Sequence, residues 1–175
     1  MDKFVKFIYS AIIIAFASVI VFLIADIKFA LIVLFLALLI DAYRIYKEKV
    51  GQELVVAFLF ALIVTSYWIY EYAGNNFIIG RINLFPLISW TTGLVLLREI
   101  YERVLNKNFI KTIVFYLISL FAVEYIGYWI LNIHLNTNYP SLFNLGIIHA
   151  SLGLKLFYLL AGPIYILITD YLKVK

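Results

Sequence analysis

The sequence predicts an all-α, polytopic transmembrane helix bundle, because the chain is too apolar for a water-soluble fold and its apolar residues form long runs. Of its 175 residues, 66% are hydrophobic and 14% are charged, and the mean hydropathy is +1.04. A soluble domain is about half apolar and a quarter charged. A soluble fold of this size would expose much of this hydrocarbon to water. We therefore expect one transmembrane domain over residues 1–175 and exclude soluble-enzyme, nucleic-acid-binding and disordered proteins.

Six apolar runs approach the roughly 20 residues that a helix needs to cross a hydrocarbon core. The chain lacks the short alternating pattern of membrane barrel strands, so the runs are predicted to be helices. The predicted spans are 4–24, 29–46, 54–73, 84–97, 109–132 and 152–172. The fourth span is short, but residues 98–107 continue its helical period. There Arg98 with Glu102 and Glu99 with Arg103 form i,i+4 pairs, which are typical of a helix that emerges into water.

The lysine and arginine residues orient this bundle. With the N-terminus inside, eleven of the fourteen lie on the cytoplasmic side and three outside, as the positive-inside rule requires. The eleven are Lys3, Lys6, Arg44, Lys47, Lys49, Arg98, Arg103, Lys107, Lys111, Lys173 and Lys175; the three are Lys28, Arg81 and Lys155. We expect six spans with both termini cytoplasmic, in a prokaryotic cytoplasmic membrane.

An alternative for the first span is a signal peptide cleaved after Ala15-Phe16-Ala17. The apolar run continues through Ala25, which is longer than the hydrophobic region of a typical signal peptide, so a retained span is favoured.

Two similar segments indicate that the bundle is built from repeated hairpins. Glu71-Tyr72-Ala73-Gly74 and Glu124-Tyr125-Ile126-Gly127 share a Glu-Tyr-x-Gly pattern, and prolines follow at positions 86 and 140. Two hairpins of the same orientation would be parallel repeats about an axis normal to the membrane. Chance similarity between aromatic-rich apolar segments explains the pattern equally well, so both interpretations remain open.

Glu71 and Glu124 are the candidate catalytic residues. A carboxyl group within the bilayer costs several kcal/mol unless it is paired or faces a cavity, which makes such residues candidates for function. Glu124 falls well inside the fifth span, and Glu71 lies near the outer end of the third. Two carboxyl groups could share general-acid and general-base roles if the fold brings them together. The structural alternative is that they pair with Arg81 or Lys155 and only fix the packing of the helices.

The candidate substrate-binding residues are Arg81, Trp90, Trp129, His149 and Lys155, all expected in the outer half of the bilayer. Aromatic residues make up 18% of the chain and gather toward the outer ends of spans three to five, where Trp68 also lies. Such a cluster is typical of an interfacial aromatic belt, and it could instead line a pocket for an apolar ligand.

Metal and cofactor sites are not expected. The chain has no cysteine, and its two histidines, at positions 134 and 149, do not have metal-binding spacing. Nucleotide-binding glycine motifs, aspartate-rich diphosphate motifs and serine-hydrolase elbows are also absent from the sequence.

One segment resembles a family of membrane enzymes. Glu71-x-x-Gly74, then Phe77, Gly80-Arg81 and Pro86-Leu87-Ile88-Ser89-Trp90 resemble part of the carotenoid-biosynthesis hydratase-type proteins, although the proline-to-tryptophan spacing differs. Small lycopene-cyclase-like membrane proteins are similar in having short helices with glutamates, but their Pro-x-Glu signature is missing. The resemblance covers residues 71–90 and implies acid chemistry on a polyene within the bilayer, with Glu71 and Glu124 involved.

Three functional classes therefore remain. The favoured class binds an apolar, isoprenoid-like or lipid substrate in the outer half of the bilayer, or performs acid–base chemistry on it. A small-solute or proton-coupled transporter and a non-catalytic subunit of a membrane complex are the alternatives. The expected partners are membrane lipids and an apolar small molecule, with no nucleic acid, and the oligomeric state is left open.

Overall fold

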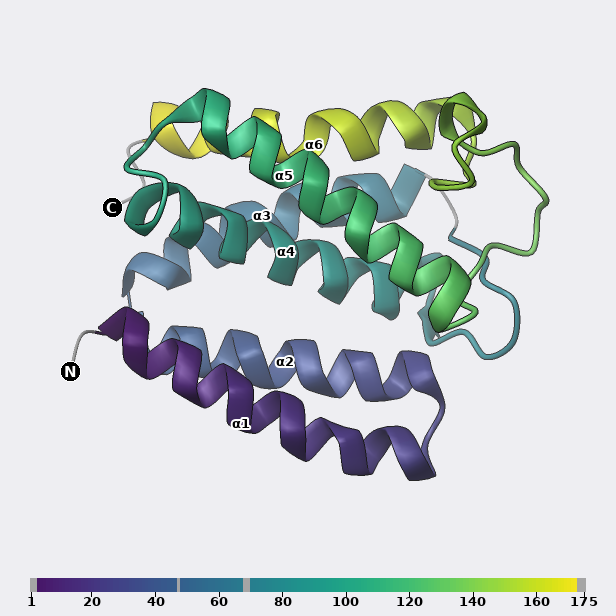
Figure 1. Ribbon diagram of the computed structural model, residues 1–175, viewed down its shortest axis with the longest axis horizontal. Coiled ribbons are helices and arrows are strands. Elements are labelled where there is room, and N and C mark those ends of the chain that lie inside the picture. Colours follow the sequence, from purple (N-terminus) through teal and green to yellow (C-terminus); the bar gives the residue numbers. More distant parts are fainter. Residues whose placement is uncertain (1–2, 47, 68–69, 173–175) are drawn as a thin grey trace.

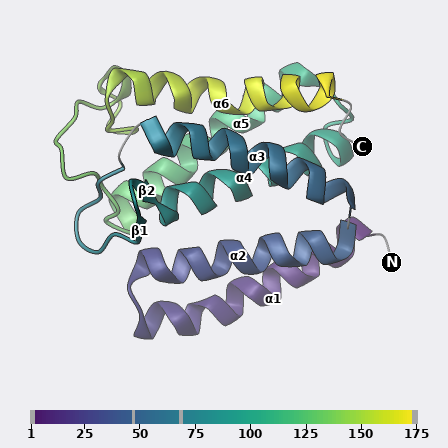
Figure 2. The ribbon, with the colours of Figure 1, turned by 180° about the vertical axis from the view of Figure 1, so that it is seen from behind.

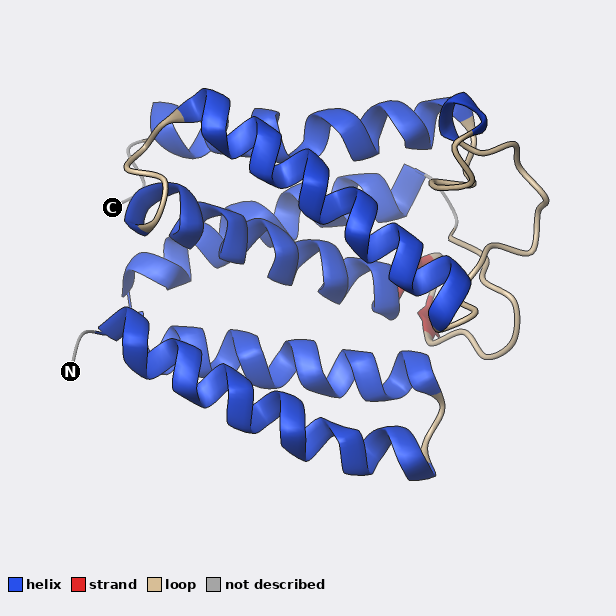
Figure 3. Ribbon diagram, in the orientation of Figure 1, coloured by secondary structure: helices blue, strands red, loops and turns tan. Residues whose placement is uncertain are grey.

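The computed structural model describes residues 3–46, 48–67 and 70–172, which form a bundle of long α-helices (Figure 1). The helices are α1 (Lys3–Ile24), α2 (Ile27–Tyr46), α3 (Glu48–Tyr67), α4 (Leu84–Arg103), α5 (Phe109–Tyr125) and α6 (Leu152–Tyr171). The remaining elements are short: strands β1 (Ile78–Ile79) and β2 (Ile82–Asn83), the π-helix η1 (Ile126–Ile130) and the 3₁₀-helix η2 (Leu142–Asn144). The helical fold class is therefore confirmed, with one two-residue antiparallel hairpin in the described residues (Figure 3).

Four of the helices in the described part are long and apolar enough to cross a membrane: α1, α2, α6, and α5 together with η1. The apolar part of α3, Val50–Thr65, is shorter, and α4 does not meet the same criterion. Length and composition thus support four of the six predicted spans. Lys47, Trp68, Lys173 and Lys175, which entered the sequence-based expectations, lie outside the described residues.

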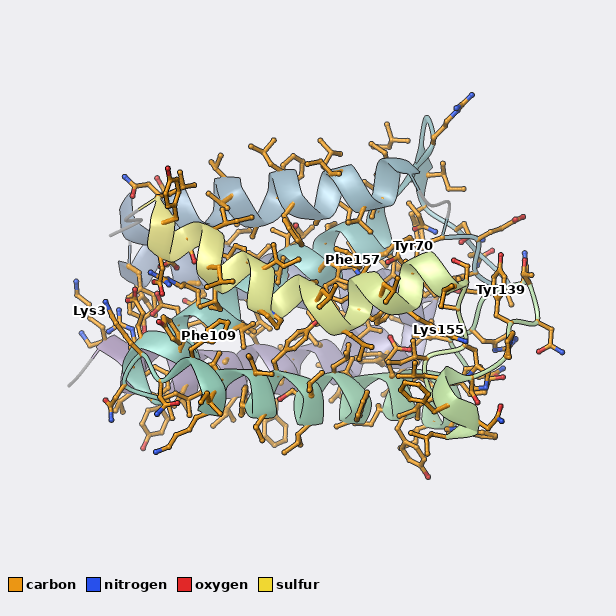
Figure 4. All side chains as sticks on the ribbon, turned by 90° about the horizontal axis from the view of Figure 1, so that it is seen from above. Lys3, Tyr70, Phe109, Tyr139, Lys155 and Phe157 are labelled. Atoms are coloured by element: carbon orange, nitrogen blue, oxygen red, sulfur yellow. The ribbon has the colours of Figure 1, made fainter. Side chains whose placement is uncertain are left out.

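The helices run back and forth between two ends of the bundle (Figures 1 and 2). At one end, here called the terminal end, α1 begins and α6 finishes. At the other, here called the hairpin end, lie residues 70–83 and 131–151, which connect α3 to α4 and α5 to α6. Figure 4 shows Lys3 and Phe109 near the terminal end and Tyr139 among the loops of the hairpin end.

Helix α4 forms the centre of the bundle, since α2, α3, α5 and α6 all pack against it. Eleven of its 20 residues are buried. By contrast, α1 packs chiefly on α2 and exposes apolar side chains such as Phe16 (74%) and Leu23 (80%). Because its neighbours surround it, α4 can carry polar residues that a lipid-facing helix could not.

The third helix begins and ends earlier than the predicted 54–73. It begins at Glu48, six residues before the predicted start. The prediction excluded Glu53 as a charged residue, but its side chain is fully buried in the bundle. It ends at Tyr67, and residues 70–73 are not helical. They are held instead by the other connection at the hairpin end: Tyr72 forms a β-bridge with Leu135, the N–H of Ala73 donates to the carbonyl of His134 at 2.9 Å, and that of Asn136 donates to the carbonyl of Glu71 at 2.8 Å.

The end of the fourth helix also differs from the prediction. It finishes at Arg103, and the left-handed conformations of Asn106 (φ 51°) and Lys107 (φ 58°) prevent its continuation. The predicted Arg98–Glu102 ion pair is present at 2.9 Å, and Arg103 pairs with Glu99. However, the side chains of Arg98 and Glu99 are only 2% and 3% exposed, so the start of this segment is buried, and the chain becomes exposed only from Arg103 onward.

The two Glu-Tyr-x-Gly segments have different local structures. Glu71 lies in the non-helical connection after α3, which turns at Gly74 (φ 73°), whereas Glu124 lies within α5. Pro86 occupies the first turn of α4, whereas Pro140 lies in an irregular loop. The motif therefore does not mark equivalent positions, and the repeat loses its main support.

Candidate functional site

A cavity of about 540 Å³ lies over one face of α4, between α2 and α5. Its α4 wall runs from Phe85 to Ile100, which is about 22 Å at 1.5 Å per residue. Most of the lining is aliphatic or aromatic, with Leu31 and Phe35 of α2 on one side and Phe115 of α5 on the other. We call this space the apolar cavity.

The apolar cavity opens sideways between the helices. Rim residues of α5 such as Val123 and Ile126 line it and are also 64% and 44% exposed. Gly93, in the middle of the α4 wall, leaves open space, because a Cβ built on it would meet no atom within 4 Å. An elongated apolar molecule could therefore enter from the side without crossing the polar loops.

Glu124 contributes a carboxyl group to the wall of this cavity. It lies one residue before the end of α5, where the chain changes from α-helix to the π-helix η1. Single π-turns of this kind are rare and are found frequently at functional sites, because they change which side chains share one helix face. Here Glu124, Gly127 and Tyr128 all line the cavity across the change of helix type.

No basic side chain in the described residues forms an ion pair with Glu124. Its polar neighbour is Tyr158 of α6, which lines the same cavity and interacts electrostatically with the carboxyl group. The alternative in which Arg81 or Lys155 neutralises Glu124 is not what the structure shows. Arg81 lies exposed in the turn of the β-hairpin, and the Lys155 ammonium donates to the carbonyl of Ser141 at 3.3 Å.

Aromatic residues hold Tyr158 in place beside the cavity. The Trp90 ring packs edge-on against Tyr158, with 5.1 Å between ring centroids, and against Phe157 at 4.7 Å. The Tyr116 hydroxyl donates to the Tyr158 carbonyl. Trp90, Tyr116 and Tyr158 all line the cavity, so this corner is rigid, aromatic and supplied with hydroxyl groups.

His149 lines the cavity at its hairpin end. Its ring stacks on that of Tyr128, with centroids 4.0 Å apart and planes 16° apart. The preceding residue, Ile148, has φ 51°, a left-handed conformation that is strained for a β-branched side chain. At this left-handed turn Ile148 is buried in the core, and the next residue, His149, lines the cavity.

The structure brings three of the seven sequence-predicted site residues to this cavity: Glu124, Trp90 and His149. The remaining four residues are not part of the cavity lining. Glu71 and Arg81 are exposed, Lys155 bonds to Ser141, and Trp129, 59% exposed, donates from its indole nitrogen to the carbonyl of Gly146 at 2.9 Å. Glu71 and Glu124 are therefore not a pair of catalytic carboxyl groups in one cavity.

Tyr116 and Tyr158 were not singled out from the sequence. With 14 tyrosines in the chain, nothing in their own positions distinguished these two from interfacial or core tyrosines. Tyr116 does lie eight residues before Glu124, and therefore on the same face of α5, which was the one available signal.

A second polar cluster lies at the terminal end, away from this cavity. Arg98 binds Asp170 at 2.5 Å and Glu102 at 2.9 Å, and its Nε lies 3.8 Å from a carboxylate oxygen of Glu53. The Tyr101 hydroxyl also donates to Asp170, at 2.7 Å. Because one arginine with several carboxylate neighbours joins α3, α4 and α6, the arrangement indicates a structural role.

The described residues contain no group of three or more histidine, cysteine or acidic side chains placed to hold a metal ion. Comparison of the chain with protein-family models, with curated proteins and with solved structures finds no match.

Proposed function

We propose that this chain is a multi-pass integral membrane protein that binds an isoprenoid-like or lipid molecule in the apolar cavity, where Glu124 acts as an acid–base group. The observation that carries the proposal is the carboxyl group of Glu124 in the wall of a large apolar cavity, without an ion-pair partner in the described residues. Retaining a carboxyl group in such surroundings is costly, which favours a functional reason for its presence.

Embedding in a membrane is supported by the outer surface of the bundle. The lipid-facing candidates α1, α5 and α6 expose large apolar side chains, among them Ile13 (67%), Ile118 (64%) and Leu167 (55%). In the proposed topology all six long helices cross the bilayer and both termini are cytoplasmic. Helix α4 then crosses as a central helix, shielded by its neighbours.

The shape of the cavity supports an elongated ligand. An extended acyl or isoprenoid chain needs a long, narrow, apolar space, and the α4 wall provides about 22 Å. The resemblance to carotenoid-biosynthesis proteins agrees with an isoprenoid ligand in part: Pro86 and Trp90 of that segment line the cavity, whereas Glu71 does not.

Filling the cavity tests ligand binding. We expect Gly93→Phe to abolish the fluorescence increase of methyl cis-parinarate, an uncharged polyene ester, when it binds to the protein in phosphatidylcholine nanodiscs. The matched control is Ala122→Phe, which adds the same ring to an exposed position of α5 outside the cavity lining. If methyl cis-parinarate binds equally to both variants and to the unmodified protein, its binding site is not the apolar cavity.

Glu124→Gln tests the acid–base role. We expect the unmodified protein to promote deuterium incorporation into lycopene or squalene in D₂O, because protonation and deprotonation of a double bond exchange its hydrogens. Mass spectrometry should show a loss of exchange of at least about 100-fold in the variant, the usual contribution of a general acid or base. Binding of methyl cis-parinarate should change little, because Gln keeps the size of the side chain.

The same variant separates the proposal from a structural role. If Glu124→Gln leaves deuterium exchange intact, or if no exchange is detected with either polyene, the acid–base role fails. A lowered unfolding temperature with unchanged exchange would show that Glu124 serves the packing of α5.

A further inference from the structure

A second cavity, of about 310 Å³, adjoins the apolar cavity at the hairpin end. We call it the loop cavity, because most of its lining comes from residues 134–139 of the connection between α5 and α6. Tyr128, His134, Leu135 and His149 line both cavities. The two cavities are therefore adjacent, with these side chains at their boundary.

The lining of the loop cavity is polar and contains no acidic residue, lysine or arginine. It contains the side-chain amides of Asn136 and Asn138, the hydroxyl groups of Thr137 and Tyr139, and two imidazole rings. Figure 4 shows Tyr139 beyond the helix ends, on the side where a head group would reach water. Amides, hydroxyl groups and aromatic rings hydrogen-bond and stack with neutral hydroxylated groups.

His149 stands at the boundary between the two cavities with an unused hydrogen-bonding atom. Its Nδ1 is buried and has no hydrogen-bond partner. A buried polar atom without a partner is costly, and if the His149 ring turns so that a ligand group reaches Nδ1, a hydrogen bond there removes this cost. Burial and the neighbouring Lys155 ammonium both lower the pKa of His149, so the ring is neutral and offers a donor on one nitrogen and an acceptor on the other.

We propose that the ligand is an amphiphile whose neutral, hydroxyl-bearing head group, such as a glycerol or a sugar, occupies the loop cavity and hydrogen-bonds to His149, while its single chain lies in the apolar cavity. This inference rests on the proposed function, because it assigns the head group of the same ligand. The lining of the loop cavity offers a phosphate or carboxylate head no lysine or arginine, and the ammonium nearest to His149, that of Lys155, already donates to the carbonyl of Ser141.

Three competitors with the same chain length and the same single cis double bond test the head-group preference. They are monoolein, with a glycerol head; oleyl phosphate, with an anionic head; and methyl oleate, whose ester donates no hydrogen bond. The assay measures the concentration of each competitor that displaces methyl cis-parinarate from the protein in phosphatidylcholine nanodiscs. We expect monoolein to displace the probe at a concentration at least tenfold lower than either of the others.

The variant His149→Phe keeps a ring to stack on Tyr128 and removes both nitrogens. We expect it to reduce the advantage of monoolein over methyl oleate to less than threefold. Asn138→Leu, which makes a loop-cavity side chain apolar, should reduce the advantage in the same direction.

The outcomes separate the two proposals. If methyl cis-parinarate does not bind the unmodified protein, the proposed function fails. If it binds and all three competitors displace it equally, the apolar cavity stands and the head-group site is wrong. A preference for oleyl phosphate would overturn the neutral head in favour of an anionic one.

Discussion

Gly162 of α6 occupies a position where no side chain fits. A Cβ there would lie 2.6 to 2.7 Å from carbon atoms of the Tyr116 ring. That ring cannot move aside freely, since its hydroxyl group donates to the carbonyl of Tyr158. Close packing at Gly162 therefore sets the approach of α5 to α6, and with it the position of both tyrosines beside Glu124.

We expect Gly162→Ala to destabilise the protein by about 1 to 3 kcal/mol, the usual cost of overpacking a filled interior. Its matched control is Gly93→Ala, where a Cβ meets open space and should stabilise α4 by about 0.5 to 1 kcal/mol. Reversible unfolding in mixed detergent micelles measures both. Equal effects of the two substitutions would contradict the close contact at Gly162.

Two helices in the bundle begin with an asparagine cap, but in different surroundings. Asn83, 4% exposed, accepts from the N–H of Phe85 at 3.1 Å and donates to the carbonyl of Tyr70 and to Asn76. Asn108 is exposed and accepts from the N–H of Lys111 at 3.0 Å. The first cap thus ties α4 to the connection that follows α3, whereas the second serves α5 alone.

Removing these caps should have unequal effects. We expect Asn108→Ala to cost about 1 kcal/mol, the typical value of a helix cap. Asn83→Ala should cost at least twice as much, because it also leaves the buried carbonyl of Tyr70 without its donor. The free energies of unfolding of the two variants measure these costs. A smaller loss for Asn83→Ala than for Asn108→Ala would contradict the role of Asn83 in tying α4 to the connection after α3.

At the scale of the whole molecule, the arrangement of the helices brings the basic connections together. The start of α1, the end of α2 and the connection between α4 and α5 all lie at the terminal end (Figure 1). These segments contain Lys3, Lys6, Arg44, Arg103 and Lys107. The geometry of the described residues is therefore compatible with the proposed orientation, in which this end faces the cytoplasm.

Single cysteines test this topology without a background, since the chain has no cysteine of its own. A cysteine at Asn138, exposed at the hairpin end, should react with a membrane-impermeant maleimide in intact cells. One at Asn106, exposed between α4 and α5, should react only after the cells are permeabilised. Labelling of Asn106→Cys in intact cells would contradict the orientation.

The helical class and most helix boundaries could be predicted from the sequence because they depend on local properties. Four predicted spans, 4–24, 29–46, 109–132 and 152–172, match α1, α2, α5 with η1, and α6 within a few residues. The boundaries predicted for span three were wrong because they depend on non-local partners. Glu53 reaches Arg98 at one end, and Tyr72 pairs with Leu135 at the other.

The high apolar content and the few intramembrane acids, read from the sequence alone, predicted a membrane helix bundle and indicated Glu124, Trp90 and His149 as candidates. Only the tertiary structure decided that these three share a cavity and that Glu71 does not. It also decided that Arg98 is buried among acidic groups instead of facing water. The physical reason is that hydropathy and helical period act over one or two turns of a single helix. A cavity is formed by the crossing of helices that are far apart in the chain, here α2, α4, α5 and α6.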